Sequence, residues 1–141
     1  MPRTGRTATQ TTPASEIALE AVGAVDQIDK ADWDACAAPP GTAYNPFVSH
    51  DFLAAAENSG SAVPLAGWAA RHLVARQNET IVGVAPCYLK SHSKGEYVFD
   101  HGWADAYMRA GGAYYPKLQV AVPFTPATGP RLLVRDGADT D

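Results

Sequence analysis

The chain has few cysteines and no long apolar run, and both shortages exclude classes of protein. Its two cysteines, Cys36 and Cys87, lie in apolar surroundings, so we expect them to be buried and reduced rather than joined in a disulfide. No apolar run approaches the ~20 residues that a membrane-spanning helix needs, and the first residues lack the apolar core of a signal peptide. We therefore expect a cytoplasmic protein with no membrane span.

Positive charge is also in short supply. Lysine and arginine number 11 against 15 aspartates and glutamates, which gives a net charge of −4 at pH 7. This balance provides no general electrostatic surface for DNA or RNA, so we expect no nucleic-acid partner. At 141 residues the chain fits one domain. We place that domain at residues 16–134, between a disordered tail at 1–15 and a frayed C-terminus at 135–141.

The apolar pattern predicts strands and helices in alternation. The polar connector at 77–79 predicts that the strands on either side of it pair antiparallel. The expected elements are a strand at 16–22, a helix that Asp26 or Asp29 caps, a helix from Ser49 to about Asn58, strands at 70–76 and 80–90, a short strand at 96–100, a helix at 103–110, and strands at 118–124 and 131–134.

The strand at 80–90 decides the fold class. It is apolar on both faces, which favours helices that cover the sheet, while Pro86 cannot donate to a ladder and marks a bulge or an edge. We predict an α/β (α+β) fold with a mixed, largely antiparallel sheet flanked by helices. Nothing follows the strand at 131–134 to pack on it, so the sequence reads as an incomplete half-domain. Its exposed edge would pair with a partner or with a second copy in a homodimer.

The stretch from Tyr88 to Trp103 concentrates charged, imidazole and aromatic side chains. Such a composition favours a polar cleft at the end of a buried sheet. Imidazoles and carboxylates together could bind zinc or iron, but no His-Glu-x-x-His spacing is present. We therefore favour a hydrated polar turn whose acids cap neighbouring elements, and we expect no metal. The residues weighed as metal ligands are His92, Glu96, Asp100, His101 and Asp105.

Three other groups of residues in or near this region could be functional, and each also has a structural explanation. Asp100 and His101 are adjacent, so on a strand they would face opposite ways and could not form a catalytic pair alone. A thiol in an apolar strand, such as that of Cys87, is usually inert. A set of basic and aromatic side chains could line a groove for an anionic or sugar-containing ligand, or the basic groups could pair with nearby acids. That set is Lys90, Lys94, Lys117, Arg131, Tyr97, Tyr107, Tyr114 and Tyr115.

Several runs resemble the FemAB-like family of acyltransferases. They are residues 88–100, 103–107, 114–126 and 128–131, together with Asn45-Pro46-Phe47 before the helix that starts at Ser49. Family members are similar to the GNAT N-acyltransferases and are often described as peptidoglycan biosynthesis proteins. The resemblance implies a mixed sheet with helices on both faces. Family members usually run beyond twice this length in two related halves, so it also implies that this chain is an N-terminal portion.

The resemblance implies transfer of an acyl or aminoacyl group to the amine of a small-molecule or peptide acceptor. Such transfer needs a base for the amine and donors for the carbonyl oxygen. No catalytic base is assigned. No glycine-rich Q/R-x-x-G-x-G/A loop occurs, so we expect no cofactor in this part, and an acyl-CoA or aminoacyl donor would bind elsewhere. The alternative is a non-catalytic interaction module that dimerises through its exposed edge. The residues expected to form an acceptor-side wall are Lys90, His92, Tyr97, Asp100, His101, Trp103 and Tyr107.

Overall fold

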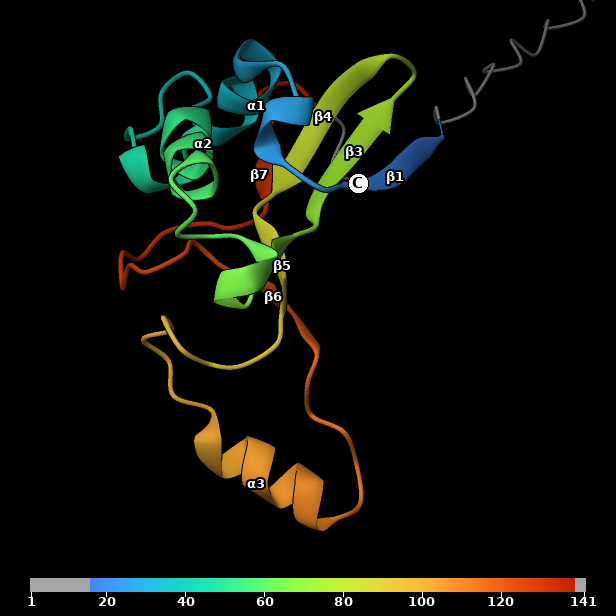
Figure 1. The fold of residues 1–141 in the computed structure, drawn as a ribbon. Coiled ribbons are helices and arrows are strands. Elements are labelled where there is room, and N and C mark those ends of the chain that lie inside the picture. Colours follow the sequence, from blue (N-terminus) through green and yellow to red (C-terminus); the bar gives the residue numbers. More distant parts are fainter. Residues whose placement is uncertain (1–15, 139–141) are drawn as a thin grey trace, which may run out of the picture.

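The computed structural model describes residues 16–138, which fold into two small antiparallel sheets with three α-helices (Figure 1). This confirms the predicted mixed class of helices and largely antiparallel strands. The predicted tail at 1–15 and the last residues, 139–141, lie outside the described residues. None of the described helices is long and apolar enough to cross a membrane.

The strands divide into a four-stranded sheet in the order β1-β3-β4-β7 and a three-stranded sheet in the order β2-β5-β6. Short 3-10 turns lie at Val25–Gln27, Pro46–Val48 and Pro64–Ala66. The strands are β1 Ile17–Val22, β2 Trp68–Ala70, β3 His72–Gln77, β4 Thr80–Ala85, β5 Cys87–Lys90, β6 Lys117–Val120 and β7 Leu133–Val134; the helices are α1 Lys30–Ala37, α2 His50–Asn58 and α3 His101–Arg109.

The strand predicted at 80–90 is two strands in different sheets, because the chain changes sheet at Pro86. Pro86 has no N–H for the ladder, and its carbonyl accepts from Ala121 N, 3.1 Å away, in the second sheet. The strand predicted at 70–76 is divided in the same way at Arg71, whose N–H donates to Cys87 O. The single predicted sheet is therefore two sheets, joined where both of these strands are interrupted.

Local signals place the first two helices and the hairpin correctly. The Asp29 carboxylate accepts from Ala31 N at 2.8 Å, and Ser49 Oγ accepts from Phe52 N at 3.3 Å, as expected of N-cap residues. The β3–β4 hairpin turns at Asn78, whose φ of 56° is a left-handed conformation that asparagine tolerates. The short strand predicted at 96–100 is absent among the described residues, since no neighbouring strand pairs with that segment.

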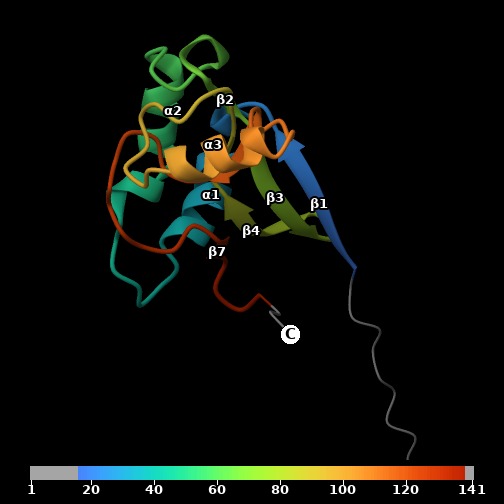
Figure 2. The ribbon, with the colours of Figure 1, turned by 90° about the horizontal axis from the view of Figure 1, so that it is seen from below.

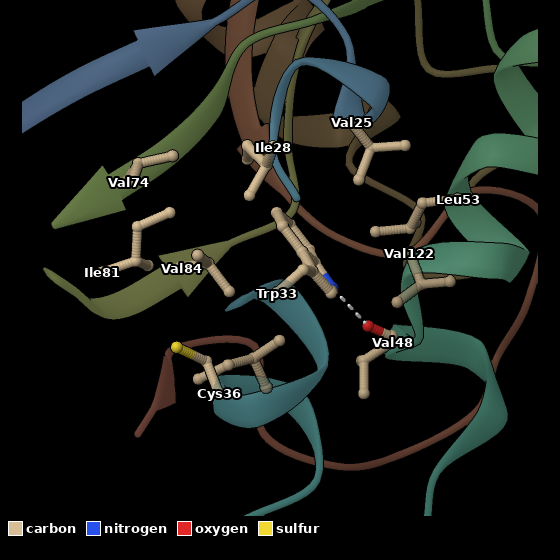
Figure 3. Packing of buried hydrophobic residues seen from close by; sticks show 11 residues of the cluster. Val25, Ile28, Trp33, Cys36, Val48, Leu53, Val74, Ile81, Val84 and Val122 are labelled. Atoms are coloured by element: carbon tan, nitrogen blue, oxygen red, sulfur yellow. Dashed lines mark hydrogen bonds between the residues drawn. The ribbon is translucent and has the colours of Figure 1, made fainter. Parts of the chain in front are cut away.

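The main core lies between α1, α2 and the inner face of the first sheet (Figure 3). Trp33 is its largest side chain and is fully buried, and its Nε1–H donates to Val48 O at 2.8 Å. The outer face of the same sheet is open: Leu19 is 79% exposed, and Leu73 and Val134 are exposed beside it. The expectation that helices bury both faces of the 80–90 strand is therefore wrong for β4, because helices cover only its inner face.

Helix α3 lies apart from both sheets at the end of a long excursion between β5 and β6 (Figures 1 and 2). Ala104 is its one buried residue. At the other end of the chain, Arg135 falls in the predicted frayed terminus, yet its N–H donates to Val82 O at 2.9 Å and its guanidinium is paired with Asp32. Residue 135 is thus bound to β4 and to α1.

Candidate functional site

A charged cluster begins on the second sheet, where three residues stand directly opposite one another. Trp68 of β2 is paired with Lys90 of β5, and Lys90 is paired with Lys117 of β6. Directly opposed residues of antiparallel strands project from the same face. Lys90 Nζ lies 3.4 Å from the centroid of the Trp68 ring, and the lysine side chain is 0% exposed. Two neighbouring lysines in such a position need anionic partners.

The partners come from the connection between β5 and α3. Glu96 Oε2 lies 2.9 Å from Lys117 Nζ, and Asp100 Oδ2 is paired with the same ammonium group. Glu96 Oε1 lies 3.7 Å from Lys90 Nζ. Gly95, with φ +81°, lets the connection approach so closely that a Cβ there would lie 2.6 Å from the Phe124 ring. The resulting cluster of two lysines and two carboxylates carries no net charge.

Tyrosine and serine hydroxyls complete the cluster. Tyr114 OH donates to Asp100 Oδ2 at 2.7 Å, Ser93 Oγ and Tyr115 OH lie 2.6 Å apart, and Lys117 Nζ donates to Ser93 Oγ at 3.0 Å. The Lys90 ammonium group donates to Lys94 O at 3.0 Å. These hydrogen bonds fix both carboxylates and both lysines in position.

The two lysines differ in their proton affinity. Burial lowers the pKa of Lys90 to about 8, although Glu96 opposes this shift. Burial alone would also lower the pKa of Lys117. Hydrogen bonds to Asp100 and Glu96 outweigh this effect and raise the pKa of Lys117 above its ordinary value. For Asp100, burial would raise the pKa, yet the hydrogen bond from Lys117 and those that accompany it hold it well below its usual range. Around neutral pH, therefore, Asp100 and Lys117 are charged, and Lys90 is the member closest to losing its proton.

A cavity of about 330 Å³ adjoins the cluster, and Glu96 and Trp68 belong to its wall. The segment that follows β6 also lines this cavity, and so does Arg131. Three buried polar atoms of the wall residues find no hydrogen-bond partner within residues 16–138: Trp68 Nε1, Glu96 Oε1 and Gln119 Oε1. Buried polar atoms are normally paired, so this concentration beside one cavity indicates a place for a polar ligand.

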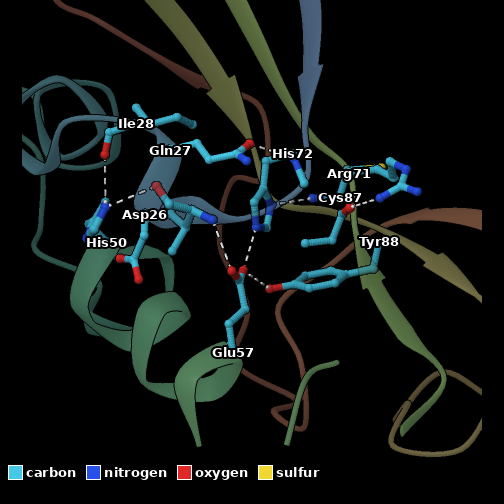
Figure 4. Close-up of polar contacts among 12 residues, drawn as sticks. Asp26, Gln27, Ile28, His50, Glu57, Arg71, His72, Cys87 and Tyr88 are labelled. Carbon is cyan, nitrogen blue, oxygen red and sulfur yellow. Dashed lines mark hydrogen bonds and ion pairs between the residues drawn. The ribbon is translucent and has the colours of Figure 1, made fainter. Parts of the chain in front are cut away.

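A second buried polar network joins α2 to both sheets (Figure 4). Glu57 Oε1 lies 2.6 Å from His72 Nε2 and 3.4 Å from Tyr88 OH, and Glu57 Oε2 accepts from Val25 N at 3.0 Å. His72 Nδ1 accepts from Cys87 N at 3.2 Å, so it is Nε2 that donates to Glu57. His72 is wholly buried, and we read this network as structural.

The structure brings together three of the seven residues expected to form an acceptor-side wall. Lys90 and Asp100 belong to the charged cluster, and Tyr97 lines the cavity. His92 instead packs on Gly67, where a Cβ would lie 2.3 Å from the imidazole. The other three, His101, Trp103 and Tyr107, lie on α3 with exposed side chains, and Trp103 is 77% exposed.

The residues weighed as metal ligands do not converge. Among residues 16–138, no group of three His, Cys, Asp or Glu side chains is arranged to hold a metal ion. Two of the acids, Glu96 and Asp100, are bound by Lys117 instead.

Sequence reasoning missed Trp68, Gln119 and the Glu57–His72 pair. A lysine at the end of the most apolar strand was one available signal, because a buried ammonium group requires a counterion and an aromatic face suits it. No local pattern could have identified Glu57, whose carboxylate meets His72 only through the packing of α2 on the sheets. Free, buried cysteines were predicted, and Cys36 and Cys87 are both free and buried.

Comparison with known proteins gives one result. A FemAB-like family model, described as peptidoglycan biosynthesis/recognition, matches residues 24–141. A search of curated proteins and a search of solved structures each found no match. The matched segment contains all three helices, the charged cluster and the cavity. Because the match covers most of the chain, this protein belongs to the FemAB-like family.

Proposed function

We propose that this chain forms the acceptor side of an N-acyltransferase in peptidoglycan biosynthesis, which transfers an acyl or aminoacyl group to an amine. The family description supports a role in peptidoglycan biosynthesis or recognition, and the reaction type, the relation to GNAT enzymes and a cytoplasmic location belong to the proposal. The observation that carries it is Glu96, a carboxylate in the cavity wall whose Oε1 has no hydrogen-bond donor among the described residues.

Glu96 suits an amine acceptor for an electrostatic reason. An acceptor amine arrives as ammonium and has to lose a proton before it can attack a carbonyl carbon. Glu96 is the one carboxylate among the described wall residues, so it is placed to hold the ammonium group and to receive its proton. Lys117 binds the other Glu96 oxygen at 2.9 Å and would keep the carboxylate oriented during this step.

We place the acyl donor outside the described residues. At the N-termini of α1 and α2, Asp29 and Ser49 already accept from the backbone N–H groups of Ala31 and Phe52. A helix N-terminus that holds a pyrophosphate needs those N–H groups free. The N-cap of α3 is Asp100, a charged carboxylate that would repel a pyrophosphate. An acyl-CoA or aminoacyl donor would therefore bind to another part of the enzyme, beside the acceptor cavity.

The test is a transfer assay with the protein in its longest natural form. Muropeptides with free amines serve as acceptors, acetyl-CoA and an aminoacyl-tRNA as alternative donors, and mass spectrometry detects the acylated acceptor. We expect product with one donor and a loss of about tenfold or more with Glu96→Gln, since a charged hydrogen bond contributes roughly 1.5–3 kcal/mol. Glu20→Gln, in an exposed pair with Arg76, is the matched control and should retain activity. Absence of product with both donors would refute the proposal.

A second candidate function, homodimerisation as a non-catalytic interaction module, is favoured by the open face of the first sheet. That face has an apolar groove of about 210 Å³ lined by Leu19, Leu73 and Val134, among others, and β7 is an edge strand. Exposed apolar patches of this kind often mark interaction sites. Sedimentation equilibrium decides: a tight dimer without transfer activity favours this function, and a monomer at high concentration excludes it.

A further inference from the structure

The polar atoms around the cavity form a pattern that specifies more than an amine. The charged cluster next to it is balanced in net charge, but its contacts leave one oxygen without a hydrogen bond: Lys117 holds Asp100 and Glu96 Oε2, while Glu96 Oε1 lies 3.7 Å from Lys90 Nζ, beyond hydrogen-bond distance. The polar groups that still lack a partner belong to the residues of the cavity wall. They are two acceptor oxygens, one N–H donor and one cation, and they come from different segments of the chain.

The two acceptors are Glu96 Oε1 and Gln119 Oε1. Glu96 is 3% exposed, and although its Oε1 lies 3.7 Å from Lys90 Nζ, neither that atom nor Gln119 Oε1 has a hydrogen-bond partner among the described residues. A buried acceptor without a donor destabilises the protein, because it has lost its hydrogen bonds to water and gained none in return. A ligand ammonium or amide N–H at this position would supply the missing hydrogen bond.

The unpaired donor is the indole N–H of Trp68, which is buried in the same wall. Its ring is fixed on one side by Lys90, 3.4 Å from the ring centroid, and it lies against the Phe124 ring, with 5.2 Å between the ring centroids. The N–H can only donate, so its natural partner is a carbonyl oxygen of the ligand.

The unmatched cation is Arg131. Its guanidinium donates to backbone carbonyls of its own loop, at 3.1 Å from Gly129 O and 3.3 Å from Pro130 O, and among the described residues no carboxylate pairs with it. The loop thus holds the guanidinium in place without neutralising it. A guanidinium of this kind is suited to bind a carboxylate through two parallel hydrogen bonds.

We propose that the cavity binds a short peptide that carries both a free amino group and a free carboxylate. Glu96 and Gln119 receive the ammonium and amide N–H groups, Trp68 donates to a peptide carbonyl, and Arg131 pairs with the carboxylate. This deepens the proposed function and rests on it, because the bound ammonium group is the acceptor amine. A volume of about 330 Å³ is at the small end of ligand cavities and suits a dipeptide.

Binding requires a small displacement of the wall. Glu96 Oε1, Gln119 Oε1 and the indole N–H of Trp68 are buried, so a ligand has to displace a wall residue to reach them. Tyr97 and Val98 follow Glu96 in an irregular segment and are 58% and 83% exposed. Because these two side chains are largely exposed, they are the part of the wall that can move at least cost.

Calorimetric titration of the protein with alanyl-alanine tests the proposal, with three related ligands as controls. N-acetyl-alanyl-alanine lacks the ammonium group, alanyl-alanine amide lacks the carboxylate, and N-acetylglucosamine represents a sugar. We expect saturable binding of alanyl-alanine, at least about tenfold weaker binding of each blocked dipeptide, since each loses a charge-assisted contact, and no binding of the sugar. These comparisons use the unaltered protein and do not depend on the folding of a variant.

Two variants then assign the ends of the ligand. Glu96→Gln should abolish the preference for a free amine and leave the preference for a free carboxylate, and Arg131→Gln should do the reverse. Glu20→Gln and Arg76→Gln remove the same charges from an exposed pair on the first sheet and should bind like the unaltered protein. Urea midpoints of all four variants show whether each is folded.

Equal binding of the free and blocked dipeptides, no saturation with alanyl-alanine, or binding of the sugar alone would overturn the proposal. These outcomes are separate from the transfer assay. Dipeptide binding without acyl transfer would refute the proposed function and leave the ligand class standing. Acyl transfer without dipeptide binding would leave the function standing and refute this ligand class.

Discussion

Glu57 Oε1 lies 2.6 Å from His72 Nε2, and this contact fixes α2 against β3. The same carboxylate accepts from Val25 N and from Tyr88 OH, so one side chain satisfies groups from three segments. Burial of His72 and Tyr88 is complete. Water therefore cannot replace the carboxylate as the hydrogen-bond acceptor of their polar atoms.

Removal of this carboxylate should destabilise the fold strongly. Glu57→Ala leaves an imidazole N–H, a phenol and a backbone N–H without their acceptor, and since each buried donor left unsatisfied costs about 1–3 kcal/mol, the total should be about 3 kcal/mol or more. Glu57→Gln keeps an acceptor oxygen and should cost less, about 1–3 kcal/mol. Urea unfolding measures both. The control Glu20→Gln, in an exposed pair, should change the free energy of unfolding by less than about 0.5 kcal/mol. Equal effects of all three substitutions would contradict the role assigned to Glu57.

Lys90 should make stability rise with pH above pH 8. The unfolded lysine keeps its proton up to about pH 10.4, while burial lowers the pKa of Lys90 in the folded protein to about 8. Between these values the unfolded state binds more protons, so the free energy of unfolding increases with pH. Lys90→Met has no proton to lose at this position, so its free energy of unfolding lacks this rise. The free energy of unfolding of the unaltered protein, measured relative to that of Lys90→Met, should increase by about 1–2 kcal/mol from pH 7.5 to 9.5. Urea unfolding at each pH measures it. A constant difference would show that Lys90 retains an ordinary pKa.

Gly67→Ala should destabilise the protein through two separable effects. Gly67 has φ +80°, and a Cβ there would lie 2.3 Å from His92 Nε2. The left-handed conformation alone costs a non-glycine residue about 1–2 kcal/mol, and the contact with the imidazole adds to it. His92→Ala removes the contact but not the conformational cost, so the double variant should recover part of the loss. A double-mutant cycle in urea measures the two parts. No recovery would show that the imidazole can move aside freely.

Two tryptophans should respond very differently to truncation. Trp33 is buried in the main core and donates to Val48 O, so Trp33→Ala should cost about 3–5 kcal/mol. Trp103 is exposed on α3, so Trp103→Ala should change stability by less than about 0.5 kcal/mol. Thermal and urea unfolding test both. If Trp103→Ala nevertheless lowers acyl transfer at unchanged stability, the α3 face contacts the acceptor; unchanged transfer would remove Trp103 from the acceptor-side wall.

The sequence by itself determined the parts of the fold that few neighbouring residues decide. Ser49 caps α2 as predicted, and of the two caps predicted for α1, Asp26 and Asp29, the structure has Asp29, because a cap needs only a side-chain oxygen and the next two or three backbone N–H groups. The antiparallel turn at 77–79 and the buried, reduced cysteines follow from equally local patterns. Sequence resemblance also pointed to the FemAB-like family, which the family match confirms.

Only the tertiary structure decided where the apolar strand at 80–90 divides and which charges meet. The sequence presented Pro86 as the mark of a bulge or an edge, whereas the change of sheet there depends on Ala121, whose N–H donates to the Pro86 carbonyl at 3.1 Å. Lys117 meets Glu96 across 21 positions of sequence, and Trp68 and Gln119 reach the cavity through strand pairing alone. Such contacts arise from the free energy of the whole packed chain, since register and burial bring together residues that no local pattern connects.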